Sequence, residues 1–595
     1  MNNYSLNKTD IEHEKDKGVL VTAWKRLVPL MKEEGGSVVL ALITIFISSA
    51  AMLVVPILIG HIVDVYLQSK NFHGVLVFSG ILSLVFLIGL VASYVQVKTM
   101  GGVGRRLLFN LRNKIFEKLE ELPVAFFNQN KEGDIISRIN NDTDKLNQFF
   151  SQAFMQFISN IVLIIGTGIF LLVISFKLGV VALIPAVFAL VLTQILSPWV
   201  KRTSLFSLRS LGGMSGEISE SINNFKVIVA FNRLDYFRDK FKEVNEINYK
   251  ASISAGVASN IFNPIYTLAG VLGQIGVLAY GIYLISVGNF TLGLLISFLL
   301  YVNNFYNPLR QLASVWSSLQ LALAGLDRIS EILSLESNIK ILSREEVENS
   351  STDTSKSTVL EFKNVYFEYS NGKEVLRNIN FKLEKGKTYA FVGPTGGGKT
   401  TTASLMARLY DPTKGEVYLE GKDIRTYSGD ERAKKIGFIL QEPFLFTGTV
   451  YENILYGNKE HAGYSHEKLA EVLEKANLTK LLSRFSDGLD TQILLGGGAI
   501  SLGQKQLIAF MRAVLRNPDV LILDEATANI DTVTEQLLEE ILKKLPEKTT
   551  RVIIAHRLNT IENADEIFFV NGGEIKLAGN MEHAVDMLLH GKRQS

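Results

Sequence analysis

Phe391-Val-Gly-Pro-Thr-Gly-Gly-Gly-Lys-Thr400 is the stretch that decides the fold of half of this chain. It fits the spacing G-x-x-x-x-G-K-[ST] and lies between an apolar, strand-like run and a helix-like segment. Glycines let consecutive backbone N–H groups turn toward phosphate oxygens, and a helix N-terminus adds a positive dipole end. A glycine-rich turn without function is the alternative, since the chain has 47 glycines, but the strand and helix flanks argue against it. The stretch therefore predicts a loop that binds a nucleoside triphosphate.

Two side chains of the loop have predicted roles of their own. Lys399 is expected to neutralise the β- and γ-phosphates, and the hydroxyl of Thr400 is expected to ligate Mg²⁺. The predicted nucleotide-binding residues of this loop are Gly393, Pro394, Thr395, Gly396, Gly397, Gly398, Lys399, Thr400 and Thr401.

Val520-Leu-Ile-Leu-Asp-Glu525 is an apolar strand that ends in two acids. A buried strand accepts consecutive apolar residues, but it accepts adjacent carboxylates only where it ends at a site. Asp524 is expected to hold Mg²⁺ through its water shell, and Glu525 is expected to polarise the attacking water. The pair therefore predicts a hydrolytic centre next to the phosphate loop.

Two further apolar strands are each followed by a polar residue. His556 follows Arg551-Val-Ile-Ile-Ala555 and is expected to contact the γ-phosphate. Gln441 follows the run 436–440 and is expected to bridge Mg²⁺ and the attacking water. Taken alone, His556 would more often be an ordinary surface or capping histidine, so its assignment depends on the other motifs.

In order and spacing these motifs resemble those of exporter-type ATP-binding cassette (ABC) transporters, along the whole chain. The resemblance implies that Tyr369 stacks on adenine and that Ile500-Ser-Leu-Gly-Gln504 is the signature motif. It also places Asp531 in the D-loop, within Ala528-Asn-Ile-Asp531. The implied architecture is that of a type IV ABC exporter, an α-helical six-span transmembrane domain fused to an α/β P-loop nucleotide-binding domain. The implied cofactors are ATP and Mg²⁺, and the implied reaction is ATP hydrolysis coupled to transport.

Composition indicates a chain that is half membrane-embedded and half soluble. Of the 595 residues, 47% are hydrophobic, and the mean hydropathy of +0.21 is too high for a purely soluble ATPase. The formal net charge of +2 gives no reason to expect nucleic acid as a partner. The absence of cysteine excludes disulfides, thiolate metal sites and cysteine catalysis. Whether that absence is natural or engineered stays open.

Long apolar segments fill the first half of the sequence, each longer than the ~20 residues that cross a bilayer. The polar first 19 residues predict a cytoplasmic tail, and the spacing of apolar residues over 20–31 predicts an amphipathic helix at the membrane face. The six predicted spans cover residues 37–67, 74–100, 152–176, 178–200, 256–287 and 290–312. The predicted domains are a tail with an elbow helix (1–36), a transmembrane domain with six helices and two long cytoplasmic extensions (37–334), a linker (335–356) and an ABC nucleotide-binding domain (357–595).

Cations indicate the orientation of these spans. Residues 101–150 hold eight Lys and Arg residues and residues 201–250 hold nine, whereas the opposite connections are nearly bare. By the positive-inside rule both basic segments, both termini and the ATPase lie on the cytoplasmic side of the cell membrane. The tips of the two segments, near 126–133 and 221–229, are similar to the coupling helices of exporters.

The signature departs from the family pattern Leu-Ser-Gly-Gly-Gln. Ser501, Gly503 and Gln504 are retained, but Leu502 replaces a glycine where the backbone is expected to pass close to phosphate. The substitution adds bulk and is expected to restrict φ and ψ. Just upstream, Leu494-Leu-Gly-Gly-Gly498 lacks the glutamate-containing segment that is common in symmetric exporters.

In this family each ATP lies between two motifs of one chain and the signature of the other. The two motifs are Walker A, the phosphate loop at 393–400 here, and Walker B, the strand with two acids at 520–525. A chain with Glu525 and His556 but an altered signature therefore resembles the catalytic-glutamate-bearing subunit of a heterodimeric bacterial exporter of the multidrug type. The partner, a second ABC half-transporter, would receive Ser501, Leu502, Gly503 and Gln504 at its own nucleotide site. A homodimer whose signature has drifted neutrally is the alternative.

The predicted function is ATP-driven export of hydrophobic or amphipathic compounds across the cytoplasmic membrane by alternating access. A homodimeric lipid flippase and a dedicated peptide exporter are alternatives, and so is a cassette protein that gates or regulates a partner without transport. Few charges in the spans predict a mostly apolar, aromatic-containing cavity. Asp64 is a candidate outer-gate residue, because an acid in the membrane is costly and usually functional or paired; a solvated or capping role fits equally well.

Overall fold

The computed structural model describes residues 4–6, 29, 32, 34–337, 339, 341–342, 357–369, 372–494, 500–524, 532–554, 563–579 and 581–590. The chain forms two compact units. The first unit combines residues 1–7, 120–132 and 335–595, and the second combines residues 8–119 and 133–334. Most of the predicted elbow helix (20–31) and of the predicted linker (335–356) lies outside the described residues.

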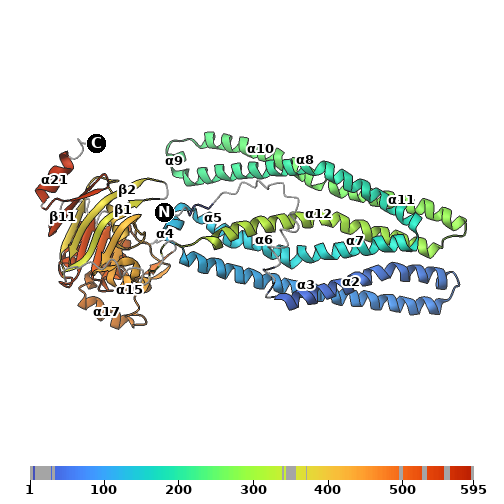
Figure 1. The fold of residues 1–595 in the computed structure, drawn as a ribbon, viewed down its shortest axis with the longest axis horizontal. Helices are drawn as coiled ribbons and strands as arrows, with labels where there is room; N and C mark the ends of the chain where they lie inside the picture. Colours follow the sequence, from blue (N-terminus) through green and yellow to red (C-terminus); the bar gives the residue numbers. More distant parts are fainter. Residues whose placement is uncertain are drawn as a thin grey trace. The chain divides into compact units, whose positions relative to one another are not determined.

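Long helices joined by short connections make up the second unit (Figure 1). Many of them expose large hydrophobic side chains on several sides, as helices that face lipid do. In chain order they are α2 (Gly35–His61), η2 (Ile62–Leu67), α3 (Phe72–Glu121), α5 (Glu132–Ser137), η3 (Arg138–Asp142), α6 (Thr143–Gln148), η4 (Phe149–Ala153), α7 (Phe154–Ile174), α8 (Phe176–Asn223), α9 (Phe225–Ala230), α10 (Leu234–Asn260), α11 (Phe262–Ser286) and α12 (Leu292–Ser334).

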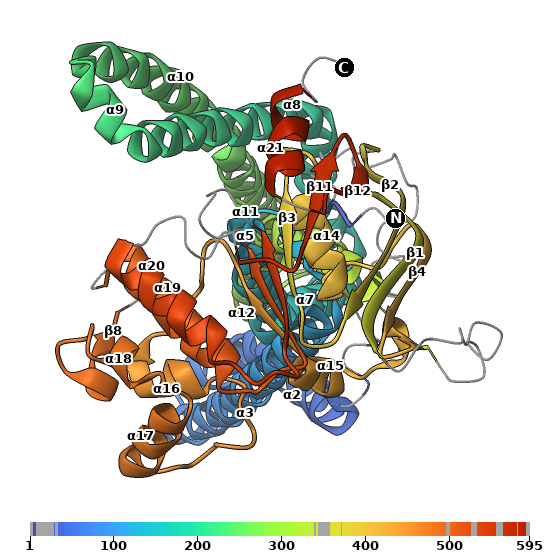
Figure 2. The ribbon, with the colours of Figure 1, turned by 90° about the vertical axis from the view of Figure 1, so that its left-hand side faces the viewer.

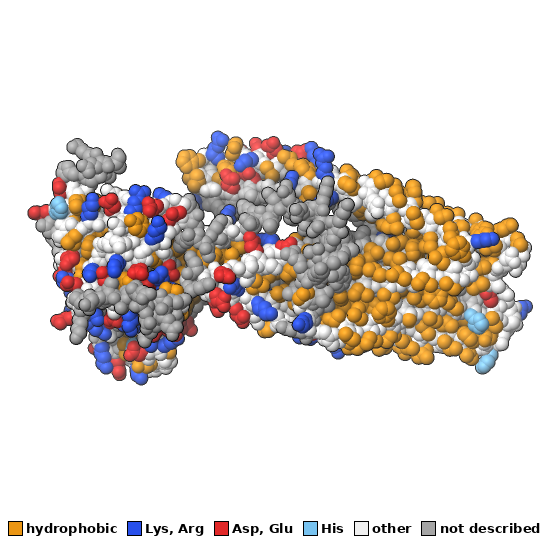
Figure 3. All heavy atoms as spheres, in the orientation of Figure 1, with side chains coloured by type: hydrophobic (Ala, Val, Ile, Leu, Met, Phe, Trp, Pro, Cys, Tyr) orange, Lys and Arg blue, Asp and Glu red, His pale blue; other side chains and the backbone are white. Residues whose placement is uncertain are grey.

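Five helical segments in the described part of the chain are long and apolar enough to cross a membrane. They are Gly35–Leu67, Phe72–Glu121, Glu132–Ile174, Phe176–Asn223 and Leu234–Ser286. Figure 3 shows hydrophobic side chains covering much of the surface of these helices toward the α11 end, whereas charged side chains gather toward α9 and α10. The sixth predicted span falls on α12, where Asn303, Asn304 and Asn307 interrupt the apolar run, so the count of six stays a prediction.

A buried ionic network joins residues 134–142 to α12 within the second unit. The side chain of Arg138 is 1% exposed, and its Nη1 lies 2.6 Å from Oε2 of Glu331. The Nε of Arg138 lies 3.0 Å from Oδ2 of Asp134. Arg328 reaches Asp134 as well and also lies 3.0 Å from Oδ2 of the fully buried Asp142. Each buried charge therefore has an opposite charge beside it, as the low dielectric of a protein interior requires.

The first unit is built on β-sheets (Figure 2). A four-stranded antiparallel sheet has the order β2-β1-β4-β5, and a six-stranded sheet has the order β12-β11-β3-β10-β9-β6. In the second sheet only β12 runs antiparallel to its neighbour. The strands are β1 (Thr358–Glu368), β2 (Glu374–Glu384), β3 (Thr388–Val392), β4 (Lys414–Leu419), β5 (Lys422–Asp423), β6 (Ile436–Ile439), β7 (Gly448–Thr449), β8 (Gln492–Ile493), β9 (Val520–Asp524), β10 (Thr550–Ile554), β11 (Glu566–Asn571) and β12 (Glu574–Leu577).

The four strands that the sequence predicts around its motifs are β3, β10, β9 and β6, and they are consecutive neighbours in the parallel part of the sheet. Their carboxyl ends therefore lie along one edge, where α/β sheets bind their ligands. The helices of this unit are α4 (Val124–Gln129), α14 (Lys399–Met406), η5 (Ile424–Thr426), α15 (Gly429–Lys435), α16 (Val450–Leu455), α17 (His466–Lys475), α18 (Thr479–Leu482), η6 (Gly488–Asp490), α19 (Leu502–Val514), α20 (Thr532–Lys543) and α21 (Met581–His590).

A short segment near the start of the chain, Tyr4–Leu6, is fixed to the residues at the end of α4; we call it the strap. The backbone N–H of Tyr4 donates to Oε1 of Gln129, and the side-chain amide of Asn130 bonds both the carbonyl of Tyr4 and the N–H of Leu6, all at 2.9 Å. The hydroxyl of Tyr4 donates to the carbonyl of Glu336 at 3.0 Å. Tyr4 is 1% exposed and Leu6 is 8% exposed. These residues of the predicted tail are therefore held in place, because the side-chain amides of Gln129 and Asn130 satisfy their backbone groups.

The helix α4 also contacts the β-rich part of the first unit. Asn128 donates from Nδ2 to the hydroxyl of Tyr410 at 2.6 Å. Burial raises the pKa of Tyr410, and its hydroxyl oxygen accepts this hydrogen bond. The ring of Tyr410 meets the ring of Tyr369 edge-on, with 5.6 Å between the centroids. A chain of direct contacts thus links α4, a predicted coupling tip, to the residue expected at the adenine.

Candidate functional site

The phosphate loop lies between the carboxyl end of β3 and the first turn of α14. Three of its glycines have φ angles in the left-handed region: +148° at Gly393, +83° at Gly396 and +112° at Gly398. Only glycine adopts these angles without strain. The first N–H groups of α14 have no partner within the helix, so the loop and the helix start offer donors to an anion.

Two loop glycines also allow close packing against β11. A β-carbon on Gly393 would lie 1.9 Å from the carbonyl oxygen of Val570, and one on Gly397 would lie 2.6 Å from the same atom. Both distances are shorter than any real contact of a β-carbon. Sequence reasoning assigned these glycines to phosphate contact alone and missed Val570, because nothing in the motif indicates which strand lies behind the loop.

Lys399 is folded back onto its own loop. Its ammonium group donates to the carbonyls of Gly393 at 2.8 Å and Pro394 at 3.1 Å, and the residue is only 6% exposed. A cation held within its loop, beside the start of α14, lies where an incoming phosphate would accept the same protons.

Thr400 and Asp524 come together from the two principal motifs. The hydroxyl of Thr400 donates to Oδ1 of Asp524 at 3.3 Å, and Asp524 is 1% exposed at the end of β9. A hydroxyl and a carboxylate oxygen are hard ligands that suit Mg²⁺. No group of three or more His, Cys, Asp or Glu residues that could hold a metal occurs within the described residues.

Tyr369 stands beside the helix that follows the loop. Its hydroxyl lies 3.1 Å from the hydroxyl of Thr401, and its ring packs edge-on against Phe367 and Tyr410. Tyr369 and Thr401, two predicted nucleotide contacts, are thus direct neighbours. The hydrogen bond and the flanking rings fix the orientation of the tyrosine ring.

The remaining predicted catalytic residues are only partly covered by the structure. Gln441 lies two residues beyond the end of β6 and is exposed. Asp524 pairs with Ile554 at the ends of β9 and β10, so the residues after both strands leave the same edge of the sheet. Glu525, His556 and Asp531 lie outside the described residues, and their roles stay predictions.

The signature residues form the start of α19. The hydroxyl of Ser501 accepts from the N–H of Gln504 at 3.2 Å, while the Gln504 side chain accepts from the N–H of Ser501 at 2.9 Å, which is a complete capping box. Leu502 is the first residue of the helix and is 40% exposed. Leucine adopts helical angles without strain, so the helical backbone at this position accommodates Leu502. Its bulk on an exposed surface is what distinguishes it from glycine.

Asp64 caps the start of α12. Its Oδ2 accepts from the hydroxyl of Thr291 at 2.5 Å, and its Oδ1 accepts from the backbone N–H of Gly293 at 2.7 Å. A β-carbon on Gly293 would lie 2.1 Å from the carbonyl oxygen of Gly60, so α12 approaches the end of α2 as closely as two backbones can. An acid that binds the unpaired N–H groups of a helix start is stabilising, which supports the capping interpretation of Asp64 over a gate.

A cavity of about 1140 Å³ opens among α2, α3, η4, α7 and α12 of the second unit. Its lining surface is mostly apolar, as expected, and it contains an aromatic residue, but many of the residues that line it are polar. Thirteen of its 26 lining residues are Ser, Asn or Gln, and Phe86 is the single aromatic residue among them. These polar residues are visible in the sequence, but the sequence does not show which of them face the same cavity, because that depends on how the helices pack.

Two family profiles match this chain. The profile described as ABC transporter transmembrane region matches residues 38–309, and the one described as ABC transporter matches residues 376–528. The chain belongs to the ABC transporter family and is an ATP-driven exporter with an ATPase domain fused to its membrane domain.

Curated relatives match over almost their full length. An uncharacterised ABC transporter ATP-binding protein of Bacillus subtilis, YfiC, is 33% identical over 96% of this chain and 92% of its own. A multidrug resistance ABC transporter ATP-binding and permease protein of Lactococcus lactis is 31% identical over 83% of this chain and 82% of its own. An ATP-dependent lipid A-core flippase of Syntrophus aciditrophicus is 30% identical over 94% of this chain and 92% of its own.

Proposed function

We propose that this chain exports hydrophobic or amphipathic compounds as one half of a heterodimeric transporter of the multidrug type. The observation that carries the proposal is the start of α19, where Leu502 presents an exposed side chain at the signature while the phosphate loop and Asp524 are intact. The signature would serve the nucleotide site of the partner, and the partner's signature would complete the site of this chain. Both termini and the ATPase would lie on the cytoplasmic side of the cell membrane.

The site residues have distinct proposed roles in ATP hydrolysis. Lys399 and the N–H groups at the start of α14 bind the phosphates, and Tyr369 contacts the adenine. Thr400 and Asp524 fit a Mg²⁺ ion, with Gln441 reaching it from β6; the ion would screen the phosphate charge. Glu525 acts as the general base, His556 contacts the γ-phosphate and Asp531 belongs to the interface with the partner.

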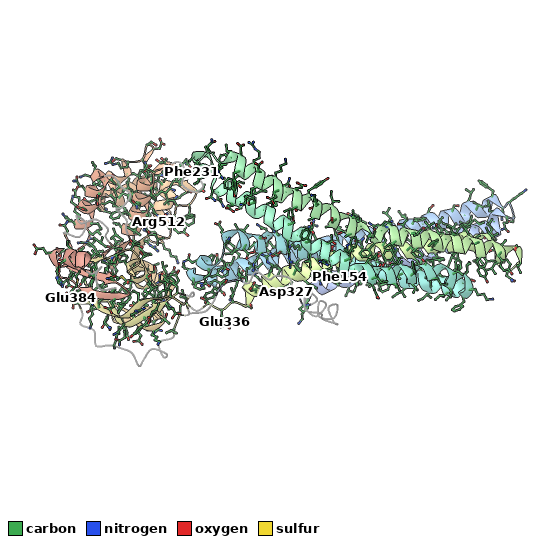
Figure 4. The ribbon with its side chains drawn as sticks, turned by 90° about the horizontal axis from the view of Figure 1, so that it is seen from above. Phe154, Phe231, Asp327, Glu336, Glu384 and Arg512 are labelled. Atoms are coloured by element: carbon green, nitrogen blue, oxygen red, sulfur yellow. The ribbon has the colours of Figure 1, made fainter. Side chains whose placement is uncertain are left out.

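The exposed apolar residues around α9 support the proposal that a second half-transporter binds this chain. Its apolar side chains Phe225, Val227, Val229 and Phe231 are each at least half exposed, and Figure 4 places Phe231 at the turn between the helices of this hairpin. A short helix with four exposed apolar residues in a basic, non-membrane segment needs a partner surface. The resemblance to exporters indicates the nucleotide-binding domain of the second half-transporter as that surface.

A comparison of the chain alone with the co-expressed pair tests the proposal. Purified alone, the chain should show weak ATPase activity, and co-expression with its cognate half should restore it. Inside-out vesicles that contain both halves should accumulate a hydrophobic fluorescent compound in an ATP-dependent manner, and Glu525→Gln should abolish accumulation. Strong, drug-stimulated ATPase of the isolated chain would contradict the heterodimer. Movement of a lipid or a defined peptide alone would instead favour a flippase or a peptide exporter, and ATPase activity without any flux would favour a regulator.

A further inference from the structure

We propose that the cavity among α2, α3, η4, α7 and α12 selects uncharged amphiphiles that carry several hydroxyl or amide groups. The inference rests on the proposed export function and names the chemical class of its cargo. It departs from the preference for lipophilic cations that a cavity lined by several aromatic residues would predict.

The lining of the cavity carries no formal charge. None of its 26 residues is Asp, Glu, Lys, Arg or His, and all of them belong to the described part of the chain. An ion that leaves water for a protein interior needs an opposite charge, or the transfer is costly. A cation could instead rest on aromatic faces, but Phe86 alone provides one here. A carboxylate, a phosphate or an ammonium group would therefore find no counter-charge on this wall.

Neutral hydrogen-bonding groups, by contrast, are abundant, and three of the amides have no hydrogen-bond partner among the described residues. Gln96 on α3, Gln152 on η4 and Asn307 on α12 line the cavity from three elements, and their side chains make no hydrogen bond to any described residue. Each amide offers two donor hydrogens and one acceptor oxygen. Hydroxyl and amide groups of a ligand match this set, because each can both donate and accept.

Two buried side chains in the cavity lining have polar atoms without a hydrogen-bond partner among the described residues. Ser49 is 2% exposed and Asn160 is 4% exposed, and both line the cavity. The Oγ of Ser49 and the Nδ2 of Asn160 are buried without a hydrogen-bond partner among the described residues. A buried polar atom without a partner costs about 1–3 kcal/mol. A ligand hydroxyl or carbonyl that these groups reach by a change of rotamer would remove that cost, which an alkyl group would not.

The rest of the lining suits an apolar tail. Met52, Leu87, Leu90, Met100 and Leu163 come from α2, α3 and α7, and methionines adapt to different shapes. A molecule with one apolar part and one polyhydroxylated or amide-rich part would satisfy both kinds of lining at once. A purely apolar compound would leave the amides without partners.

Three ligands with the same dodecyl tail test the proposal: monododecanoylglycerol, dodecanoate and dodecylamine. Each is added below its micelle concentration to the assembled transporter in lipid nanodiscs, and ATPase stimulation is measured. The neutral glycerol ester should reach half-maximal stimulation at a concentration at least about tenfold lower than either ion, a difference of ~1.4 kcal/mol. Stimulation by an ion at an equal or lower concentration would overturn the proposal and leave export intact. If no hydrophobic compound stimulates the ATPase or moves across the membrane, the proposed function itself fails.

A change of charge at the cavity gives the second test. Gln96→Glu adds a carboxylate to the lining, so dodecylamine should gain about tenfold in apparent affinity while the glycerol ester loses affinity. Gln156→Glu, at a second lining position, should act in the same direction if Gln96→Glu folds poorly. Gln194→Glu is the matched control, because Gln194 lies on α8 and does not line the cavity. Equal responses of the lining and control variants would show that the cavity does not select the ligand.

Discussion

The side-chain amide of Asn128 donates a 2.6 Å hydrogen bond to the hydroxyl of Tyr410, and the ring of Tyr410 packs edge-on against Tyr369. Asn128 belongs to α4, whereas Tyr369 neighbours Thr401 in the helix after the phosphate loop. A displacement of either end is therefore passed on through two contacts. The relationship indicates how nucleotide at the cassette and the position of α4 influence each other.

We expect Tyr410→Phe to uncouple the two functions of the transporter. The variant removes one hydrogen bond, worth about 0.5–1.5 kcal/mol, and keeps the ring packing on Tyr369. Substrate-stimulated ATPase should fall while basal ATPase stays near its normal value. Tyr427→Phe is the control, because the Tyr427 hydroxyl bonds Leu419 within the same unit and has no link to α4. Unchanged stimulation in Tyr410→Phe would show that the contact is only structural.

Glu525→Gln should retain nucleotide binding and lose turnover, because glutamine cannot accept the proton of the attacking water. General bases contribute ~10²–10⁴-fold to rates. Steady-state ATPase and equilibrium binding of ATP, both measured with the partner present, separate the two effects. Lys399→Ala should instead weaken binding itself, since it removes the cation of the loop. Near-normal turnover in Glu525→Gln would disprove the assignment of the base.

Leu502→Gly should change the partner's nucleotide site and spare the site of this chain. The substitution removes an exposed side chain at the first helical position of α19, where glycine lacks the helix preference of leucine. Because the bulk of Leu502 is removed from the signature, single-turnover hydrolysis should rise at the partner's nucleotide site, and Glu525→Gln should not abolish that gain. A gain that disappears together with Glu525 would contradict the division of labour between the two sites.

Arg138→Ala should destabilise the membrane unit severely. It removes the buried guanidinium that pairs with both Glu331 and Asp134, and the removal of one member of a buried ion pair typically costs about 3–5 kcal/mol. A lower unfolding temperature in detergent is the expected result. Arg238→Ala, which removes an exposed pair with Asp235, should leave the unfolding temperature unchanged.

Asp64→Ala should lower stability by about 0.5–2 kcal/mol and leave ATP-dependent flux intact, because the side chain caps α12. Asp64→Asn retains an oxygen for the N–H of Gly293 and should recover most of the stability. Thermal unfolding and vesicle transport of both variants provide the measurement. A loss of flux in Asp64→Asn at normal stability would restore the gate interpretation.

The nucleotide site was predictable because its residues are close in sequence to the strands that position them. Gly393 to Thr400 and Asp524 carry their own flanking strands, so their meeting at one sheet edge follows from parallel pairing. The membrane cavity was not predictable, because Gln96, Gln152 and Asn307 converge only once their helices pack. That Leu502 begins a helix was also not predicted, since the motif alone does not indicate where the helix starts.

The strap has a practical consequence for anyone who prepares this protein. Tyr4 is fully engaged with the residues that end α4, only three residues from the first methionine. We expect a purification tag or fluorescent protein joined on the amino-terminal side of the strap to weaken those hydrogen bonds and, through Asn130, to disturb α4. The ATPase or transport activity measured on such a fusion would then include an effect of the fused tag. A tag placed after Ser595 leaves the strap unaltered. A comparison of the activities of the two fusions would show how much the strap contributes to function.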